Sequence, residues 1–229
     1  MIKNDLPTIK RKNYTQQARD IIETAIMRGD FKLGEKLVEE SIAQQLNISR
    51  VPVREALRAL EKYGLVVIKP NSGVRVISLE VKDIEEVYDI RILNETYALE
   101  LCYRNSLEKT LRELERQIVE FKEIFDENDD IYDLINKDFE FDNIVFSNCG
   151  NSKLREIWLV LSPVIKIGFF HNPYYYDASS ILDFYSHEEI IMNLHNGKIE
   201  DAKKILIDHI ELSKQLICES FKKGEKKGK

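Results

Sequence analysis

The chain has 229 residues, a hydrophobic fraction of 43% and a formal net charge of -6, which suits one large or two small globular domains. No run of about eighteen apolar residues is present, and the N-terminus lacks the apolar segment of a secretory signal, so a cytoplasmic protein without a membrane span is expected. Cys102, Cys149 and Cys218 are too far apart for a disulfide framework or a thiolate metal site.

Charge is distributed unevenly along the chain. Residues 1–77 contain 14 Lys and Arg against 9 Asp and Glu, whereas residues 78–229 contain 20 against 31. A basic first part followed by an acidic second part favours a nucleic-acid contact made only by the first part.

Three helices are predicted in the basic part, over residues 14–28, 39–46 and 50–63. Gly29 is expected to end the first helix. Ser49 is placed to cap the third, whose first turn tolerates Pro52 because first-turn amides need no partner within the helix. The short turn between the second and third helices indicates a helix-turn-helix.

The third predicted helix has two distinct faces. Its apolar stripe consists of Val53, Ala56, Leu57 and Leu60. Arg50, Arg54 and Arg58 recur every four residues and share a separate face. Such a row can contact phosphates and guanine edges in a major groove, or it can be a solvated face paired with Glu55 and Glu61.

A hairpin is predicted after this helix. Residues 64–77 contain an apolar strand, a turn at residues 70–73 and a second strand. The turn, with Lys69 and Arg75 nearby, can reach the DNA backbone or minor groove, or the hairpin can simply pack against the helices. Residues 10–77 are therefore predicted to form a winged helix-turn-helix.

The stretch "GEKLVEESIAQQLNISRVPVREALRALEKYGLVVIKPNSGVRV" resembles the DNA-binding domain of the GntR family of bacterial transcription regulators. The resemblance implies that Arg50 and Arg54 contact DNA. Glu40 stands where some members carry an arginine, so a phosphate contact is not expected there. The predicted DNA-binding set is Ser49, Arg50, Pro52, Arg54, Arg58, Lys69 and Gly73.

The acidic part is predicted to be a helical bundle over residues 79–221. Its helices are expected over residues 80–104, 107–125, 130–147, 151–168, 180–195 and 199–221, and residues 222–229 are expected to be a disordered tail. The fold class is therefore mainly α, with an N-terminal winged helix-turn-helix followed by an all-helical ligand-binding bundle.

Several polar residues fall on the apolar stripes of this bundle. Asp138, Asp142, His187 and His209 are all predicted to point inward. Each can be a hydrogen-bonded core residue, or a divalent ion can satisfy all four, since unpartnered buried carboxylates are costly. Arg91 also points inward, four residues before Glu95, and either forms an internal salt bridge or holds the carboxylate of a small ligand.

The segments "YDIRILNETYA", "GNSKL" and "HEEIIMNLHNGKIEDAKKILIDHI" resemble the FCD branch of the GntR family. Many members of that branch bind a divalent metal through one aspartate and three histidines, and the metal helps to hold a carboxylate effector. Asp138, His187 and His209 match these ligands, whereas Asp142 stands at the first histidine. Zn, Ni, Mn or Fe is the expected metal, held either by all four residues or, if Asp142 does not reach it, by the other three.

The resulting prediction is a homodimeric regulator without catalytic residues that binds a pseudo-palindromic double-stranded DNA operator. A small carboxylate metabolite in the helical part would control its operator affinity. Two alternatives stay open: a metal-dependent enzyme with a two-histidine, one-carboxylate site, and a regulator with a metal-free acyl-type pocket.

Overall fold

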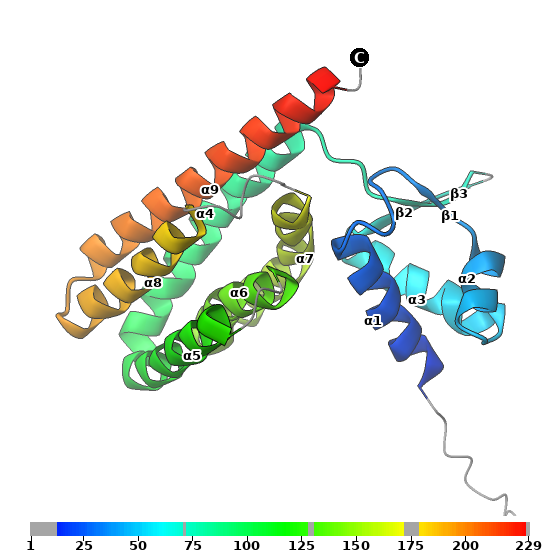
Figure 1. The fold of residues 1–229 in the computed structure, drawn as a ribbon. Coiled ribbons are helices and arrows are strands. Elements are labelled where there is room, and N and C mark those ends of the chain that lie inside the picture. The colour runs from blue at the N-terminus through cyan, green and yellow to red at the C-terminus, as the bar shows by residue number, and fades with distance from the viewer. Residues whose placement is uncertain (1–12, 71, 128–130, 172–178, 228–229) are drawn as a thin grey trace, which may run out of the picture.

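The computed structural model describes residues 13–70, 72–127, 131–171 and 179–227. They form an N-terminal domain, on the right of Figure 1, and a helical domain, on its left. No helix within these ranges is long and apolar enough to cross a membrane. Residues 10–12, the start of the predicted winged domain, lie outside the described residues.

The N-terminal domain is a winged helix-turn-helix, as predicted. Its elements are α1 (Tyr14–Met27), β1 (Lys36–Leu37), α2 (Glu39–Gln45), α3 (Arg50–Lys62), β2 (Val66–Lys69) and β3 (Gly73–Val76). The side chain of Asn13 caps α1 by accepting a hydrogen bond from the Gln16 amide. Gly29 follows the helix with a φ of 78°, a left-handed conformation that favours glycine and ends α1.

The wing belongs to a three-stranded antiparallel sheet rather than a two-stranded hairpin. The strand order is β1-β3-β2, with Leu37 opposite Val74 and Lys36 opposite Arg75. Strand β1 was not predicted, because two residues are too few to show alternation of apolar and polar side chains. Its pairing brings Lys36 beside the wing.

The core of the N-terminal domain largely follows the predicted stripes. On α3 the buried residues are Val53, Ala56, Leu57 and Leu60, the predicted set. On α1 the buried residues are Ala18, Ile22, Ile26 and Met27. Ile21, on the same helix, is half exposed and does not belong to this core.

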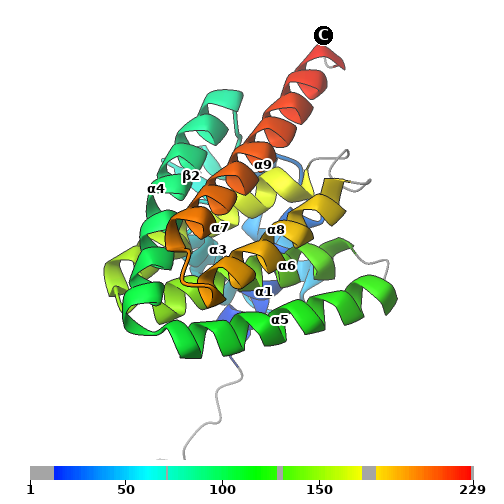
Figure 2. The same ribbon diagram turned by 90° about the vertical axis from the view of Figure 1, so that its left-hand side faces the viewer.

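The helical domain comprises α4 (Val81–Asn105), α5 (Leu107–Glu127), α6 (Ile131–Asn148), α7 (Ser152–Phe170), α8 (Ser179–His195) and α9 (Ile199–Lys227). Helix α4 packs against α6, α7 and α9, and α8 lies beside α9 (Figure 2). Helix α9 continues to Lys227, beyond the predicted end at residue 221, because the lysine-rich segment after it contains good helix formers.

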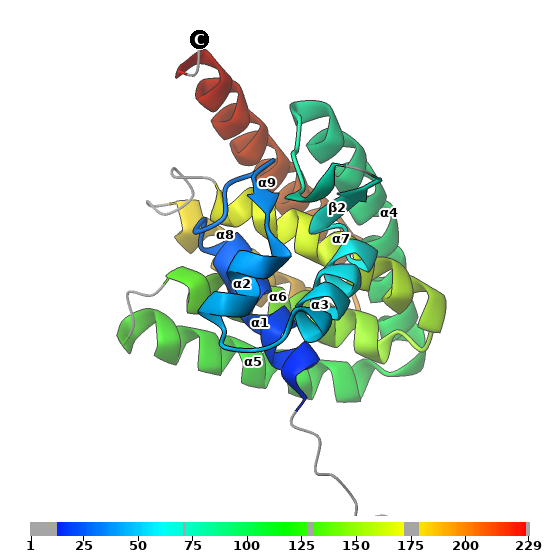
Figure 3. The same cartoon turned by 90° about the vertical axis from the view of Figure 1, so that its right-hand side faces the viewer.

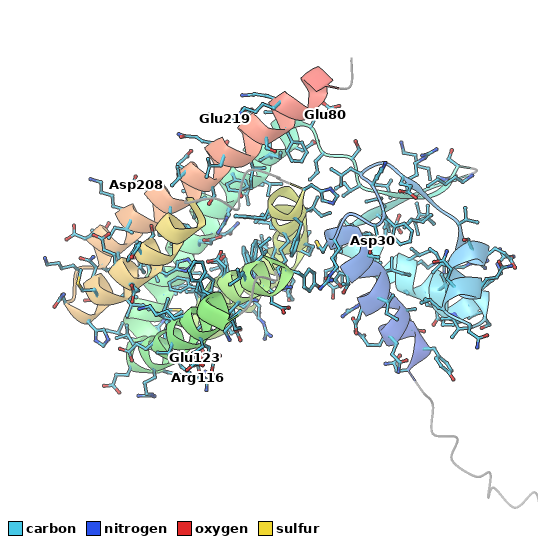
Figure 4. All side chains as sticks on the ribbon, in the orientation of Figure 1. Asp30, Glu80, Arg116, Glu123, Asp208 and Glu219 are labelled. Atoms are coloured by element: carbon cyan, nitrogen blue, oxygen red, sulfur yellow. The ribbon has the colours of Figure 1, made fainter. Side chains whose placement is uncertain are left out.

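The helical part of the chain, residues 78–229, has an excess of acidic residues, with 31 Asp and Glu against 20 Lys and Arg. Glu123, Asp208 and Glu219 are exposed on α5 and α9 and project away from the bundle in Figure 4. Cys102, Cys149 and Cys218 are buried and form no disulfide, in agreement with the expectation from their spacing. An excess of acidic residues does not favour contact with phosphates, so DNA contact belongs to the N-terminal domain.

Candidate DNA-binding face and effector site

The arginine row of α3 lies on the exposed side of the N-terminal domain. Arg50, Arg54 and Arg58 all line one groove of ≈ 560 Å³, together with Lys36 and Gly73. Half of the Arg50 and Arg54 side chains is open to solvent. The structure thus brings the helix row and the wing glycine together, as a major-groove contact requires. Lys36 was missed because β1 was not predicted.

Two acidic residues of α2 hold the recognition arginines. The guanidinium of Arg54 donates to both carboxylate oxygens of Glu39, with Nε and Nη2 at 3.0 and 2.9 Å from Oε2. Arg50 pairs with Glu40 at 3.0 Å and lies 3.8 Å from Glu39. The hydrogen bond from Arg54 lowers the pKa of the Glu39 carboxyl, which keeps it charged. In this structure both guanidinium groups are thus paired with carboxylates of α2.

The pairing differs from the solvated-face alternative, in which Glu55 and Glu61 would hold the arginine row. Glu55 instead accepts a hydrogen bond from Thr15, and Glu61 accepts one from the Ile68 amide. Both acids therefore connect elements of the N-terminal domain to each other. Arg50 and Arg54 pair with acidic residues of α2 instead, and all three arginines of the row line the groove.

The remaining predicted DNA contacts occupy supporting positions. Ser49 is the N-cap residue of α3, but within the described residues its side chain makes no capping hydrogen bond, contrary to the prediction. Pro52 lies in the first turn of α3, as predicted. Lys69 is exposed at the end of β2 opposite Gly73, whose φ of 79° favours glycine at the wing turn.

A buried ion cluster occupies the interior of the helical domain. Arg91 and Glu95, 3% and 2% exposed, pair at 2.5 Å on α4, and Arg91 Nη2 donates to Asp142 Oδ2 of α6 at 3.2 Å. Burial raises the pKa of Glu95 to about 8, with Asp142 adding to that shift. Burial opposes the charge of Arg91, but Glu95 and Asp142 outweigh it and raise its pKa. Arg91 therefore forms an internal salt bridge, and a ligand carboxylate would have to bind Arg91 in the presence of Glu95 and Asp142.

The cluster is not fully satisfied by protein groups. Arg91 Nη1 and Glu95 Oε2 are buried and have no hydrogen-bond partner among the described residues. An orphaned buried donor beside an orphaned buried acceptor is costly, and such a pair suits a small polar ligand or water.

The two predicted histidines lie next to each other beside this cluster. The rings of His187 and His209 are 4.8 Å apart, and His187 Nδ1 is 3.5 Å from Asp138 Oδ1. The ring of Phe141 stacks on His187 at 4.0 Å. Positions on α6, α8 and α9 that are far apart in sequence are thus brought together, as the stripes predicted.

The four predicted metal ligands do not converge on one point. Asp142 is turned to Arg91, which carries a positive charge that a metal ion would meet at close range. No group of three or more His, Cys, Asp or Glu side chains suited to a metal ion occurs in the described ranges. Asp142 pairs with Arg91, whereas Asp138, His187 and His209 lie together, so metal binding by these three residues, with or without Asp142, stays a prediction.

A contact between the domains was missed by sequence reasoning. In Figure 3 α1 and α3 lie in front of the helical domain, and α1 packs on α7. The hydroxyls of Thr24 on α1 and Tyr132 on α6 are 3.3 Å apart, and the ring of Tyr132 stacks on Phe170. His171, assigned no role from sequence, has its Nε2 3.1 Å from the Ile26 carbonyl. Contacts between distant segments leave no periodic signal, so they could not be predicted.

A groove lined by Lys36, Arg50, Arg54 and Arg58 on a winged helix-turn-helix, joined to a separate helical domain, is the arrangement of a DNA-binding regulator. Comparisons with known proteins agree. The model of "Bacterial regulatory proteins, gntR family" matches residues 14–76, and that of the "FCD domain" matches residues 86–212. The chain belongs to the GntR family of bacterial regulatory proteins, in the branch that carries an FCD domain.

Individual relatives support this assignment. The chain is similar to the HTH-type transcriptional regulator YdhC of Bacillus subtilis, 28% identical over 99% of both chains. It is 30% identical to the gluconate operon transcriptional repressor of Bacillus subtilis, over 62% of this chain and 57% of that one. The solved structure of E. coli McbR/YncC shares the fold, with a TM-score of 0.76 at 20% identity over 91% of this chain and 98% of that one. The matched families and relatives are transcriptional regulators, not enzymes.

Proposed function

We propose that this chain is a cytoplasmic regulator that binds a pseudo-palindromic operator as a homodimer and changes its operator affinity when a small carboxylate binds in the helical domain. The observation that carries the proposal is the orphaned guanidinium nitrogen of Arg91 beside the orphaned oxygen of Glu95. A ligand carboxylate accepts a hydrogen bond from that nitrogen, and the protonated Glu95 carboxyl can donate one to it.

The chemistry of the effector is inferred from this pair and from one relative. The gluconate operon repressor is named for a sugar acid, and a sugar acid offers both a carboxylate and hydroxyl groups. Hydroxyl groups suit the imidazoles of His187 and His209, which can act as donors or acceptors. Small hydroxy acids are therefore the first candidates to test.

Helix α6 offers a route from this site to the DNA-binding domain. It carries Asp142 in the ion cluster and Tyr132 at the contact with α1. Beside Tyr132, the Asn136 side chain accepts a hydrogen bond from Lys166 Nζ of α7 at 2.8 Å. Burial lowers the pKa of Lys166, and Glu23 of α1 and Asp142 both oppose that shift, so Lys166 is attracted to acids of both domains. A ligand that displaces Asp142 would change the charges that Lys166 meets.

A thermal-shift screen of small carboxylates, each with and without divalent metal, tests effector binding, and fluorescence anisotropy on upstream DNA then measures the effect of each hit. We expect a hit to raise the melting temperature and to change the operator Kd. Arg91→Lys keeps the charge but loses the planar fork, so the hit should no longer stabilise that variant. Binding that survives Arg91→Lys unchanged would contradict the assignment of Arg91.

A metal-free regulator is a second candidate, and the pairing of Asp142 with Arg91 favours it. Elemental analysis of the purified protein separates the two. One equivalent of Zn, Ni, Mn or Fe that is lost in Asp138→Ala and in His209→Ala supports the metal site. Metal-free protein that still responds to a hydroxy acid supports the metal-free regulator.

A further inference from the structure

The candidate DNA-binding groove holds cations of two kinds. It is lined by Lys36, Arg50, Arg54 and Arg58. The guanidinium groups of Arg50 and Arg54 are paired with carboxylates of α2. Lys36 and Arg58 are exposed as well, but within the described ranges the side chain of neither forms an ion pair or a hydrogen bond. A duplex in the groove therefore meets both paired and unpaired positive charges.

The unpaired cations come from different elements of the winged helix-turn-helix. Lys36 lies on β1 opposite Arg75 of β3. Its side chain reaches the wing turn, since Cε lies 3.5 Å from the position that a Cβ on Gly73 would occupy. Arg58 lies on α3, about two helical turns after Arg50. A duplex that enters the groove thus meets one unpaired charge from the wing side and one from the recognition helix.

The pairing decides what each cation gains from DNA of any sequence. All duplexes present phosphates, whereas a matching base edge occurs only in particular sequences. An unpaired cation that binds a phosphate releases condensed counterions and gives up no protein contact. A paired arginine exchanges a carboxylate for a phosphate and leaves that carboxylate beside the DNA backbone, so its gain is close to zero. A bidentate contact to a guanine edge, which discriminates by roughly ten- to hundredfold, is large enough to make the exchange favourable.

We propose that these cations serve two modes of DNA binding. Lys36 and Arg58 bind phosphates of any duplex and hold the protein on DNA while it searches for its operator. Arg50 and Arg54 stay with the carboxylates of α2 during the search and leave them only where a matching base edge is present. The inference rests on the DNA-binding part of the proposed function and depends neither on the effector nor on a metal.

A duplex of random sequence tests the search mode, with fluorescence anisotropy over a series of NaCl concentrations. Lys36→Gln and Arg58→Gln should each weaken binding by about three- to tenfold and lower the slope of log K against log salt by about one, because each removes one phosphate contact. The double variant Glu39→Gln, Arg54→Gln removes a whole pair without changing the net charge. It should leave the affinity within about twofold and the slope unchanged.

Lys32→Gln is the matched control, because Lys32 is an exposed lysine of the connector before β1 and does not line the groove. It should leave the affinity for the random duplex within about twofold, since salt screens charges that do not contact DNA. Circular dichroism melting checks that each variant is folded, as expected for exposed positions such as Lys36 and Arg58.

Three results would overturn the inference. The first is an unchanged slope in Lys36→Gln or in Arg58→Gln. The second is a loss in the double variant as large as in the single ones, since paired arginines would then bind phosphates during the search. The third is an equal loss in Lys32→Gln, which would reduce the effect to net charge.

Release of the paired arginines is the converse test. Glu39→Gln combined with Glu40→Gln frees Arg50 and Arg54 for phosphates, so the affinity for the random duplex should rise about tenfold and the slope should steepen by about two. An unchanged slope in this variant would contradict the claim that α2 keeps both arginines off non-specific DNA.

The proposed function can fail separately. A protein that binds random DNA in this way but shows no response to any small carboxylate would keep the division of the cations and lose the effector. An operator Kd that responds to a carboxylate, in a protein whose salt slope does not depend on Lys36 or Arg58, would do the opposite.

Discussion

The arginine–carboxylate cluster on the face of the N-terminal domain and the one inside the helical domain have different surroundings. Arg54 holds Glu39 with two hydrogen-bonding nitrogens at the surface of the N-terminal domain, where half of its side chain is open to solvent. Arg91 holds Glu95 and Asp142 in the interior of the helical domain, where all three side chains are buried.

The difference in solvent exposure determines how easily each arginine can exchange its carboxylate partner for another anion. An exposed pair contributes little to stability, so Arg54 can leave Glu39 for a phosphate or a base at small cost. A buried pair cannot be opened without leaving an uncompensated charge, so any ligand that reaches Arg91 has to replace what it displaces. The first cluster is suited to transient DNA contact, the second to selective binding of an anion.

Removal of the buried arginine is the largest expected effect. Arg91→Met leaves the Asp142 carboxylate buried without its counter-charge and Glu95 without its hydrogen-bond donor, and should lower the free energy of unfolding by about 3–5 kcal/mol. Urea denaturation followed by circular dichroism measures it. The triple variant Arg91→Met, Glu95→Leu, Asp142→Leu is the control and should recover most of the loss. An unchanged stability in Arg91→Met would remove the distinction between the clusters.

Removal of the exposed Arg54 should weaken DNA binding and leave the stability of the protein nearly unchanged. Arg54→Ala should weaken specific operator binding roughly ten- to hundredfold if Arg54 reads a base, with little change in melting temperature. Fluorescence anisotropy against operator and random DNA measures both affinities. Equal losses on the two DNAs would assign Arg54 to phosphate contact instead.

The contact between the domains should carry the response from one cluster to the other. Tyr132→Ala removes the contact with Thr24, the stack on Phe170 and the cation–π contact with Arg28. A carboxylate found in the thermal-shift screen should still stabilise this variant, while its effect on operator Kd should fall roughly fivefold. An undiminished effect on operator Kd would exclude this contact as the route. Tyr132→Phe, which keeps the ring, should show a smaller reduction.

The smallest effect is expected at the outer edge of the DNA-binding face. Glu40→Gln removes the exposed partner of Arg50, which should raise operator affinity about two- to fivefold because Arg50 becomes free for phosphate. The gain should shrink as salt is added, since it is electrostatic. Weaker binding in Glu40→Gln would mean that Glu40 positions Arg50 and does not compete with DNA.

Much of this arrangement is readable from periodicity. The stripe and the arginine row of α3 were both predicted, because each depends only on spacing along one helix. The inward direction of Arg91, Asp142, His187 and His209 was predicted for the same reason, and all four are buried, whereas Asp138, also predicted to point inward, is 20% exposed.

The choice of partners could not be predicted. Spacing gives the direction of Asp142, but only the packing of α6 on α4 decides that it meets Arg91. The pairing of Glu39 with Arg54 and the contact of Tyr132 with α1 also depend on how separate helices pack, so spacing along one helix could not predict them. Strand β1 was not predicted, because two residues are too few to show an alternating pattern. It nevertheless places Lys36 in the candidate DNA-binding groove.

The proposed function has two linked parts: α3 reads an operator, and the buried cluster controls how tightly α3 binds it. It is tested most directly by operator titration of the wild type and of Arg91→Lys, each with and without the carboxylate that stabilises the wild type. The account predicts a change in operator Kd on adding the ligand for the wild type, with little change for Arg91→Lys, and similar affinities for the two ligand-free proteins. A ligand effect of equal size in both proteins, or none in the wild type, would contradict it.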